Sequence, residues 1–407
     1  MIETFDAVVV GGGPSGATAA NELALAGHKV LLLDRAGRIK PCGGAVPPRL
    51  LREFDVPLDM LCATASSARM IAPSNKVVDM PVGEGFVGMV DRDVFDEWLR
   101  ARAALHGAER RTGTFETLER DADGTAVIAY RPKGTARGSE PQRVRAKVVI
   151  GCDGGRSGVA RQALPDAESV PFVAAYHEVI ESPPEGVGGF SNGRCDIYYQ
   201  GSLSPDFYAW VFPHGSKTSV GVGSGKKGFA LREAVTRLRQ QTGLDLCKTV
   251  RVEGAPIPLK PLKRWDNGKD VVVAGDAAGV VAPASGEGIY YAMTAGRLAA
   301  DAAGQFLVTG DPAVLKTARK RFMKAHGKVF MVLGILQWFW YRNDNMRERF
   351  VRMCRDPDVQ QLTWEAYMNK ELVRKRPMAH VRVFVKDSRQ LIGALFAGRR
   401  VSTGANP

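Results

Sequence analysis

The chain has 407 residues, which is room for two or three domains of about 100–200 residues each. With 45% hydrophobic and 24% charged residues its composition is that of an ordinary globular protein, which excludes a chain disordered throughout. Its six cysteines are scattered, without the spacing of a zinc site or of a disulfide framework, and this pattern suits a reducing cytoplasm. We expect no bound metal and, because the apolar start lacks a basic flank, no secretory signal.

The net charge of +13 is concentrated at one end of the chain. Residues 312–407 contain 20 Lys and Arg against 7 Asp and Glu, whereas residues 1–311 contain 36 of each sign. A basic region of this kind is attracted to an anionic surface, either a nucleic acid or the cytoplasmic leaflet of a membrane. A solvated basic helical face has the same composition and is the alternative.

The expected elements alternate between strand and helix, with a strand-rich segment in between. The N-terminal order is strand, glycine turn, helix and strand, over residues 6–10, 11–15, 16–25 and 29–34. A short β segment (66–82) precedes a helix (92–106), for which we expect Phe95, Trp98, Leu99 and Leu105 on one side. The later expected elements are a strand at 148–151, alternating strands at 196–200, 208–212 and 219–222, a strand at 270–274 and a helix at 288–308.

This order predicts an α/β protein with a discontinuous nucleotide-binding domain. We expect that domain in residues 1–65, 83–168 and 266–311, with a β-sheet substrate domain, residues 66–82 and 169–265, inserted into it. Residues 312–407 are expected to form a helical, basic C-terminal region.

The segment GGGPSG at residues 11–16 matches the dinucleotide-binding pattern G-x-G-x-x-G. It follows an apolar strand, precedes a helix, and is followed by an acid, Asp34, at the end of the next strand. The glycines allow a tight turn, close approach of a pyrophosphate and close helix–sheet packing, while the helix N-terminus attracts phosphate. Asp34 is placed to bind ribose hydroxyls and disfavours a 2′-phosphate, but the pattern does not separate FAD from NAD. The expected cofactor-binding residues here are Gly11, Gly13, Pro14, Ser15, Gly16, Asp34 and Arg35.

Two later segments resemble motifs of the flavoproteins with the p-hydroxybenzoate hydroxylase fold. The segment GCDGGRS (151–157) resembles their DG motif, and AGDAAG (274–279) resembles their GD motif, whose aspartate binds the ribityl chain of FAD. The segment GEGI (286–289) opens a helix whose N-terminus would stabilise negative charge on a reduced flavin. Arg92 matches an arginine that these enzymes place near the cofactor, although an exposed helix-start arginine is the alternative. The resemblance implies FAD, bound also by Arg92, Asp153, Gly154, Gly275, Asp276, Gly286, Gly288 and Ile289.

Two further segments resemble signatures of the geranylgeranyl reductases, within which the chain is most similar to the bacteriochlorophyll-type enzymes of photosynthetic bacteria. They are KPCGGA (40–45) and YAWVFP (208–213), and the resemblance covers nearly the whole chain. It implies a discontinuous FAD-binding Rossmann-like domain, an inserted antiparallel β-sheet domain and a helical C-terminal region. It also implies saturation of three double bonds of a geranylgeranyl group on bacteriochlorophyll or on a diphosphate. The implied donor is NADPH, which we expect to bind transiently; ferredoxin is the alternative.

The same resemblance brings Cys42, Gly43 and Gly44 to the flavin ring. We expect Cys42 to be catalytic, as a steric gate or a weak acid, and a packing role is the alternative. The proton donor is not identified by the sequence, since Cys42, Tyr290 and a bound water all remain open.

Tyr208, Trp210 and Phe212 share one face of a strand by two-residue alternation, while Ala209 and Val211 share the other. An aromatic stripe suits an apolar tunnel for a prenyl chain, and we expect these three residues to bind substrate. Ordinary sheet core has the same spacing.

Residues 329–341 form an apolar run of 13 residues, too short to span a bilayer. Flanking cations and the aromatic residues Trp338, Trp340 and Tyr341 suit a helix at a membrane interface, although a buried core helix is the alternative. We expect a cytoplasmic protein in peripheral contact with an anionic inner or photosynthetic membrane, and no nucleic acid partner. The cations Arg374, Lys375 and Arg376 are expected to strengthen this contact.

Other functions share these motifs. A flavin-dependent aromatic monooxygenase has the same fold and cofactor motifs, a reductase of other prenyl lipids has a similar substrate, and a prenyl-pigment carrier could retain FAD without catalysis. The oligomeric state is left open.

Overall fold

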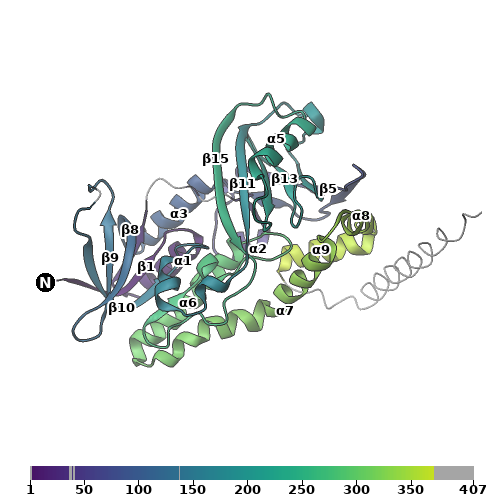
Figure 1. Ribbon diagram of the computed structural model, residues 1–407. Coiled ribbons are helices and arrows are strands. Elements are labelled where there is room, and N and C mark those ends of the chain that lie inside the picture. Colours follow the sequence, from purple (N-terminus) through teal and green to yellow (C-terminus); the bar gives the residue numbers. More distant parts are fainter. Residues whose placement is uncertain (1, 36–38, 40–41, 137, 371–407) are drawn as a thin grey trace, which may run out of the picture.

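The computed structural model describes residues 2–35, 39, 42–136 and 138–370. Two large sheets lie next to each other, and the C-terminal helices run along the first sheet and reach the second (Figure 1). Within the described residues the helices are α1 (Pro14–Leu25), α2 (Pro48–Glu53), α3 (Arg92–Leu105), α4 (Gly158–Ala163), α5 (Leu231–Gln241), α6 (Ile289–Thr309), α7 (Lys316–Trp340), α8 (Asp344–Met353) and α9 (Pro357–Asn369).

The first sheet joins parallel strands in the order β8-β2-β1-β10-β16, which is the order of a dinucleotide-binding half. Val8 of β1 is paired with Leu31 of β2 and with Val149 of β10. The last four residues of β1, the first four of β2 and all of β16 are apolar and buried, as expected for parallel strands that are covered on both faces. The strands of this sheet are β1 (Glu3–Val10), β2 (Val30–Asp34), β8 (Glu109–Arg120), β9 (Ala126–Pro132), β10 (Gln142–Gly151) and β16 (Val271–Val273).

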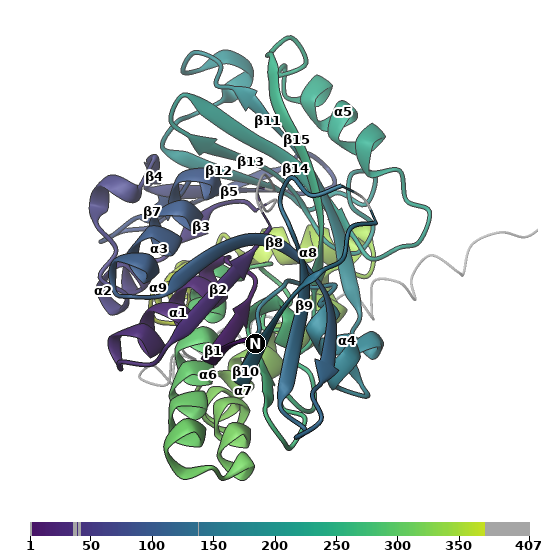
Figure 2. The same cartoon turned by 90° about the vertical axis from the view of Figure 1, so that its left-hand side faces the viewer.

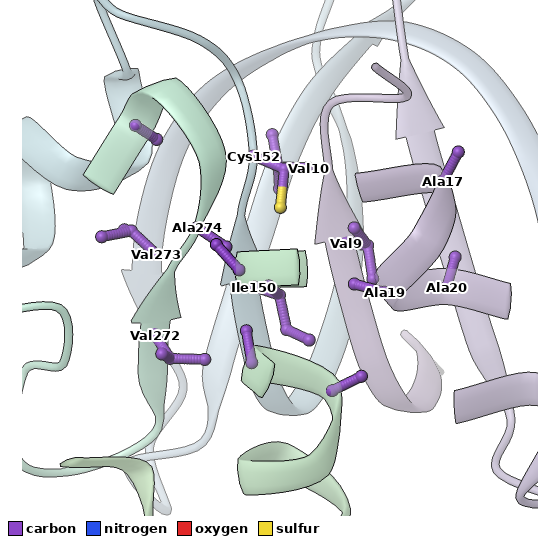
Figure 3. Packing of buried hydrophobic residues seen from close by; sticks show 14 of the residues in the cluster. Val9, Val10, Ala17, Ala19, Ala20, Ile150, Cys152, Val272, Val273 and Ala274 are labelled. Atoms are coloured by element: carbon purple, nitrogen blue, oxygen red, sulfur yellow. The ribbon is translucent and has the colours of Figure 1, made fainter. Parts of the chain in front are cut away.

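Small residues bring α1 close to this sheet. Figure 3 shows Ala17, Ala19 and Ala20 of α1 beside Val9 and Val10 of β1, all of them buried. A Cβ on Gly16 would lie 1.8 Å from the carbonyl oxygen of Gly11, and Gly11 itself has a φ of +102°. Glycine is therefore required at both positions, and the predicted strand, turn, helix and strand are confirmed. The helix begins at Pro14, two residues earlier than expected, because proline suits the first helical position.

The sequence did not predict the antiparallel part of the first sheet. The first residues of β8 pair with β2, while its later residues turn away and pair with β9, which then pairs with β10. Charged residues recur along β8, so its pattern lacks the apolar run that revealed the parallel strands.

The second sheet has seven strands in the order β15-β11-β14-β13-β12-β5-β6, antiparallel except between β12 and β5. Helix α5 covers its outer face, where Ala209 and Val211 are buried (Figure 2). The inner face carries Trp210 and Phe212, as the alternation predicted. An antiparallel β-sheet unit inserted into an α/β fold is thus confirmed. Its strands are β5 (Ser67–Ile71), β6 (Val77–Pro81), β11 (Phe172–Glu181), β12 (Arg194–Tyr198), β13 (Ala209–His214), β14 (Lys217–Ser224) and β15 (Thr249–Pro258).

A small third sheet and α3 lie between the two large ones. The sheet pairs β3 (Ala45–Val46), β7 (Val87–Met89) and β4 (Ala63–Ala65). Helix α3 buries Phe95 and Leu99, but Leu105 is 82% exposed, so its predicted place on the same side was wrong. At 100° per residue Leu105 lies about 120° around the helix from Leu99.

The described part of the C-terminal region, residues 312–370, is helical, as expected, and α7 runs beside α6 below the first sheet (Figure 1). The end of its apolar run is divided between core and surface. Trp340 and Tyr341 are buried, at 3% and 4% exposure, whereas Trp338 is 69% exposed. An interfacial position for Trp340 is therefore wrong, and the core alternative holds for that side of the helix. No helix of the described ranges is long and apolar enough to cross a bilayer.

Candidate active site

One cavity between the first and second sheets collects most of the predicted residues. It is lined from the nucleotide-binding side and from the inner face of the second sheet. The predicted residues on its wall are Gly13, Pro14, Ser15, Cys42, Gly43, Arg92, Gly154, Tyr208, Trp210, Phe212, Asp276, Gly286, Gly288 and Ile289. The other predicted residues, Gly11, Gly16, Asp34, Arg35, Gly44, Asp153 and Gly275, are not on this wall.

The N-terminus of α1 faces this cavity. Its N-cap, Gly13, has no side-chain cap, and an ideal Cβ on Gly13 would meet no described atom within 4 Å. The first N–H groups of a helix have no partner within the helix, so these donors suit a phosphate group. Gly275 packs against this turn with a φ of +64°, and a Cβ there would lie 2.7 Å from the Cβ of Ser15.

Asp34 is held beside the glycine turn. Its Oδ1 accepts a hydrogen bond from the Gly12 amide at 3.0 Å, and Arg100 approaches its Oδ2 at 3.5 Å while donating to the Gly12 carbonyl. The Asp34 side chain remains 29% exposed, so a ribose could reach it. Arg35, which follows, is exposed. Arg100 was missed by the sequence analysis, because nothing in a helical arginine indicates a contact 66 residues away.

The N-terminus of α6 opens onto the same cavity from another side. Gly288 is its N-cap and again provides no side-chain cap, and Gly286, Gly288 and Ile289 line the cavity together with Asp276. Glu287, between the two glycines, forms an ion pair with the buried Lys370 that follows α9.

The aspartate and the glycine of the DG segment, Asp153 and Gly154, have different positions relative to the cavity. Gly154 lines the cavity with a φ of +89° and open space around its Cβ position. Asp153 turns toward α4 instead: its carboxylate accepts from the Gly158 amide at 2.6 Å and from the hydroxyl of Ser157. Burial raises the pKa of Asp153 overall, although these hydrogen bonds lower it. Asp153 thus contacts the start of α4 and not the cavity.

Cys42 and Arg92 meet at the edge of the cavity. The Gly44 amide donates to the Cys42 sulfur at 3.4 Å, and a Cβ on Gly44, whose φ is +70°, would lie 2.5 Å from Nε2 of His214. Arg92 is buried and donates two hydrogen bonds to Asp96, at 2.8 and 2.7 Å. Burial lowers the pKa of Arg92, but Asp96 and Cys42 more than offset this effect and raise it. The guanidinium is therefore charged, and the exposed-arginine alternative is wrong.

The opposite wall is aromatic. The Tyr208 and Trp210 rings lie 6.0 Å apart and the Trp210 and Phe212 rings 6.3 Å apart. The hydroxyl of Tyr208 donates to the Ser285 carbonyl at 2.5 Å, and burial raises the pKa of Tyr208 well above its usual range. Phe207, stacked on Tyr208 at 4.3 Å, extends the wall and was not predicted.

Tyr290 does not reach this cavity. Its hydroxyl donates to Glu53 at 2.8 Å, and burial raises its pKa. Tyr290 is therefore set aside as a proton donor. Further lining residues that were not predicted are Cys152, Ala175, His177, Ala255, Pro256, Ile257, Val281 and Ala292.

These features fit FAD. The uncapped ends of α1 and α6 can bind anionic groups, Gly13 leaves the space that a pyrophosphate would fill, and Asp34 and Asp276 supply acceptors for hydroxyl groups. Among the described residues no cluster of His, Cys, Asp and Glu could hold a metal ion.

Comparison with known proteins agrees with this fit. The family model of the FAD binding domain matches residues 4–329, so the fold and site define an FAD-dependent oxidoreductase. A Rhodobacter capsulatus protein named geranylgeranyl diphosphate reductase is 54% identical over 96% of this chain and 98% of its own length. A Synechocystis protein of the same name is 36% identical over 97% of this chain and 98% of its own length. The chain belongs to the geranylgeranyl reductase family.

Solved structures share the fold at low identity. A geranylgeranyl bacteriochlorophyll reductase-like protein of Thermoplasma acidophilum superposes with a TM-score of 0.78 at 23% identity, covering 93% of this chain and 100% of that one. A flavin-dependent brominase covers 95% of this chain and 100% of its own, with a TM-score of 0.70 at 16% identity. Enzymes of different chemistry thus share the architecture, and function has to be argued from the site.

Proposed function

We propose that the chain reduces a geranylgeranyl group to a phytyl group by saturating three isolated double bonds with hydride from FAD. The observation that carries this proposal is the cavity, where two uncapped helix N-termini and an aromatic wall face one space. The names of the relatives agree with it. The substrate is a geranylgeranyl pigment or geranylgeranyl diphosphate, and the choice between these head groups is left to experiment.

The proposed FAD site uses both helix ends. The pyrophosphate would lie at α1, a ribose at Asp34, the ribityl chain at Asp276 and the flavin edge at α6. Bound FAD would supply the hydride for reduction. In this proposal residues 1–65, 83–168 and 266–311 form the FAD-binding domain and 66–82 and 169–265 the substrate domain. The C-terminal region, 312–407, includes residues 371–407, which lie outside the described ranges.

Tyr208, Trp210 and Phe212 would hold the prenyl chain. An isolated alkene has no carbonyl to activate it, so the wall must exclude water and hold the reacting carbons in line with the hydride donor. Cys42 lies where the cofactor side of the cavity meets this wall. The residue after Cys42, Gly43, packs against the wall, because an ideal Cβ on Gly43 would lie 3.0 Å from the Phe212 ring. We assign Cys42 the role of setting the position of the double bond.

The electron donor in this proposal is NADPH. Its support is the family resemblance, which implies a donor that binds only while it reduces the flavin. Reduced ferredoxin is the competing donor, and the two are separated by testing each with the purified protein.

Membrane contact would be made by one stripe of α7. Met331, Ile335 and Trp338 repeat at helical spacing and are 60%, 58% and 69% exposed. Lys324 and Lys328 precede them on the same side, and Arg342 lies over the Trp338 ring at 5.9 Å. An apolar stripe between cations suits the surface of an anionic membrane. We propose peripheral attachment to the cytoplasmic side of the inner or photosynthetic membrane; Arg374, Lys375 and Arg376 lie outside the described residues.

The test is to incubate the purified protein with geranylgeranyl-bacteriochlorophyll or geranylgeranyl diphosphate, together with NADPH, and to follow product mass. We expect the mass of the product to increase in steps of two hydrogens, up to six hydrogens in total. Rapid oxygen uptake with a hydroxylated product would instead indicate a monooxygenase, and bound substrate of unchanged mass a carrier. Either result contradicts the proposal.

A further inference from the structure

A second, smaller cavity adjoins the first behind the aromatic wall. Cys42, Arg92 and His177 line both cavities, so the two meet at these three residues. The smaller cavity has a volume of about 10 Å³, which is room for one water molecule when polar groups surround it. Its remaining polar lining is Asp91, His214, Lys217, Ser219, Arg251 and Glu253.

His177 occupies the boundary between the cavities with both ring nitrogens engaged. It is 2% exposed, its Nδ1 hydrogen-bonds with the Ser219 hydroxyl at 2.8 Å, and its Nε2 with Oε2 of Glu253 at 2.7 Å. The Ser219 hydroxyl also accepts from Nε1 of Trp210 at 3.0 Å. In the neutral ring Ser219 donates to Nδ1 and Nε2 donates to the carboxylate. In the imidazolium Nδ1 donates to Ser219, whose hydroxyl can then donate into the smaller cavity that it lines.

Glu253 extends this hydrogen-bonded network toward solvent. Burial raises its pKa, but His177 and Arg251 offset this effect and lower it overall, so the carboxylate is ionised. Its Oε1 is buried and lies 2.7 Å from Nε of Arg251, yet no hydrogen bond of acceptable geometry reaches this oxygen. Arg251 also bonds Asp91 at 2.8 Å, and Lys217 bonds Asp91 at 2.9 Å. Lys217 is 32% exposed, so the network ends at the surface.

Three other titratable groups on the main cavity are poor proton sources. Arg92 is charged and bound to Asp96, burial raises the pKa of Cys152 to about 12, and the Tyr208 hydroxyl is held by the Ser285 carbonyl. Among the residues that line the main cavity, His177 is hydrogen-bonded to Glu253, which lies beside Arg251 on the side toward the protein surface.

We propose that the smaller cavity, with His177 and Glu253, supplies protons to the active site. This inference rests on the proposed function. Each reduction breaks one π bond and forms two C–H bonds, one from a hydride that carries both electrons and one from a proton. The group at the cavity boundary that gives up this proton, Cys42 or a water beside it, regains one from the Ser219 hydroxyl, which in turn takes the Nδ1 proton of the His177 imidazolium. Glu253 stays ionised and stabilises that imidazolium through Nε2–H, and water in the smaller cavity returns a proton from solvent to His177 through Ser219.

The test compares His177→Gln and Glu253→Gln with Glu178→Gln. Glu178 is next to His177 on β11, but it faces away and pairs with Arg239. Each enzyme is reduced without oxygen by dithionite, mixed with geranylgeranyl diphosphate, and followed by flavin reoxidation in H₂O and in D₂O. General acid catalysis contributes about 10²–10⁴-fold, so His177→Gln should reoxidise about 10²-fold more slowly and Glu253→Gln about tenfold. Glu178→Gln should stay within about twofold of the parent.

Three readouts separate proton supply from structural damage. FAD affinity should be unchanged in both variants, and imidazole should restore part of the rate to His177→Ala. In the FAD-free protein, nitrogen NMR should show the His177 ring signals moving in Glu253→Gln and not in Glu178→Gln. Parental reoxidation rates in both glutamine variants, or FAD loss in both, would overturn the inference. If the parent itself is reoxidised neither by geranylgeranyl diphosphate nor by geranylgeranyl-bacteriochlorophyll, the proposed function fails.

Discussion

Substituting two glycines of the same turn should separate folding from cofactor binding. Gly13 has a φ of −73° and open space at its Cβ position, so alanine fits there without strain. Alanine is a poorer N-cap than glycine, which costs up to about 1 kcal/mol. Its methyl group, however, would occupy the proposed pyrophosphate position. Losing one hydrogen bond to a charged group costs about 1.5–3 kcal/mol, so the Kd for FAD should rise about 10- to 150-fold.

Gly16→Ala is the contrasting variant. Its Cβ would lie 1.8 Å from the Gly11 carbonyl oxygen and 3.0 Å from Cβ of Cys152, so α1 must move away from the sheet. Overpacking of this kind costs about 1–3 kcal/mol or more, and it should appear in the FAD-free protein. Gly334→Ala, in α7 with open space around it, is a control that should be neutral or stabilising.

The assays are urea unfolding of the FAD-free variants and FAD titration followed by flavin fluorescence. The expected pattern is a weakened FAD site in a stable Gly13→Ala protein and a destabilised Gly16→Ala protein. Parental FAD affinity in Gly13→Ala would refute the placement of the pyrophosphate at α1.

Four further outcomes are expected. Asp276→Ala should bind FAD at least about tenfold more weakly, because an acceptor for the ribityl hydroxyls is lost, and unchanged affinity by the same titration would contradict its assignment. Cys42→Ala should retain FAD but change the turnover or the number of double bonds reduced, as measured by product mass; parental kinetics would make Cys42 a packing residue. Replacing Ile335 and Trp338 together by glutamate should reduce co-sedimentation with anionic liposomes, and equal binding by the parent to anionic and neutral liposomes would count against the membrane stripe. For His214, burial lowers the pKa to about 4, so the folded protein resists its protonation. Stability should therefore fall between pH 6.5 and 4 by an amount on the order of 3 kcal/mol, and His214→Gln should show less of this loss in urea unfolding.

Local patterns predicted the nucleotide-binding turn because its requirements are local. Gly11 needs a positive φ, Gly16 needs the absence of a Cβ, and both needs arise within six residues of each other. The aromatic stripe was equally visible, since alternation along one strand decides which side chains share a face.

Contacts between distant segments were not predictable in this way. Glu253 follows His177 by 76 residues, and neither strand carries a signal that the two side chains meet. Asp153 lies in a motif associated with FAD, yet in the fold its carboxylate accepts hydrogen bonds from the first two amides of α4. A motif fixes the residue type at a position, whereas the direction of its side chain depends on the element that packs beside it.

The distribution of polarity in the cavity explains how one space could serve two unlike molecules. Helix N-termini and acidic side chains lie on the side of the first sheet, and aromatic rings lie on the side of the second. A charged dinucleotide finds hydrogen-bond donors and acceptors on the first side, whereas on the second side it would lose its hydration without gaining polar contacts. A prenyl chain has the opposite preference, because burial of its apolar surface against the aromatic rings is favourable. In the proposed arrangement each molecule is therefore confined to its own side, and the two can touch only along the boundary. Cys42, Arg92 and His177 lie on that boundary, which is where a hydride and a proton have to arrive at one double bond.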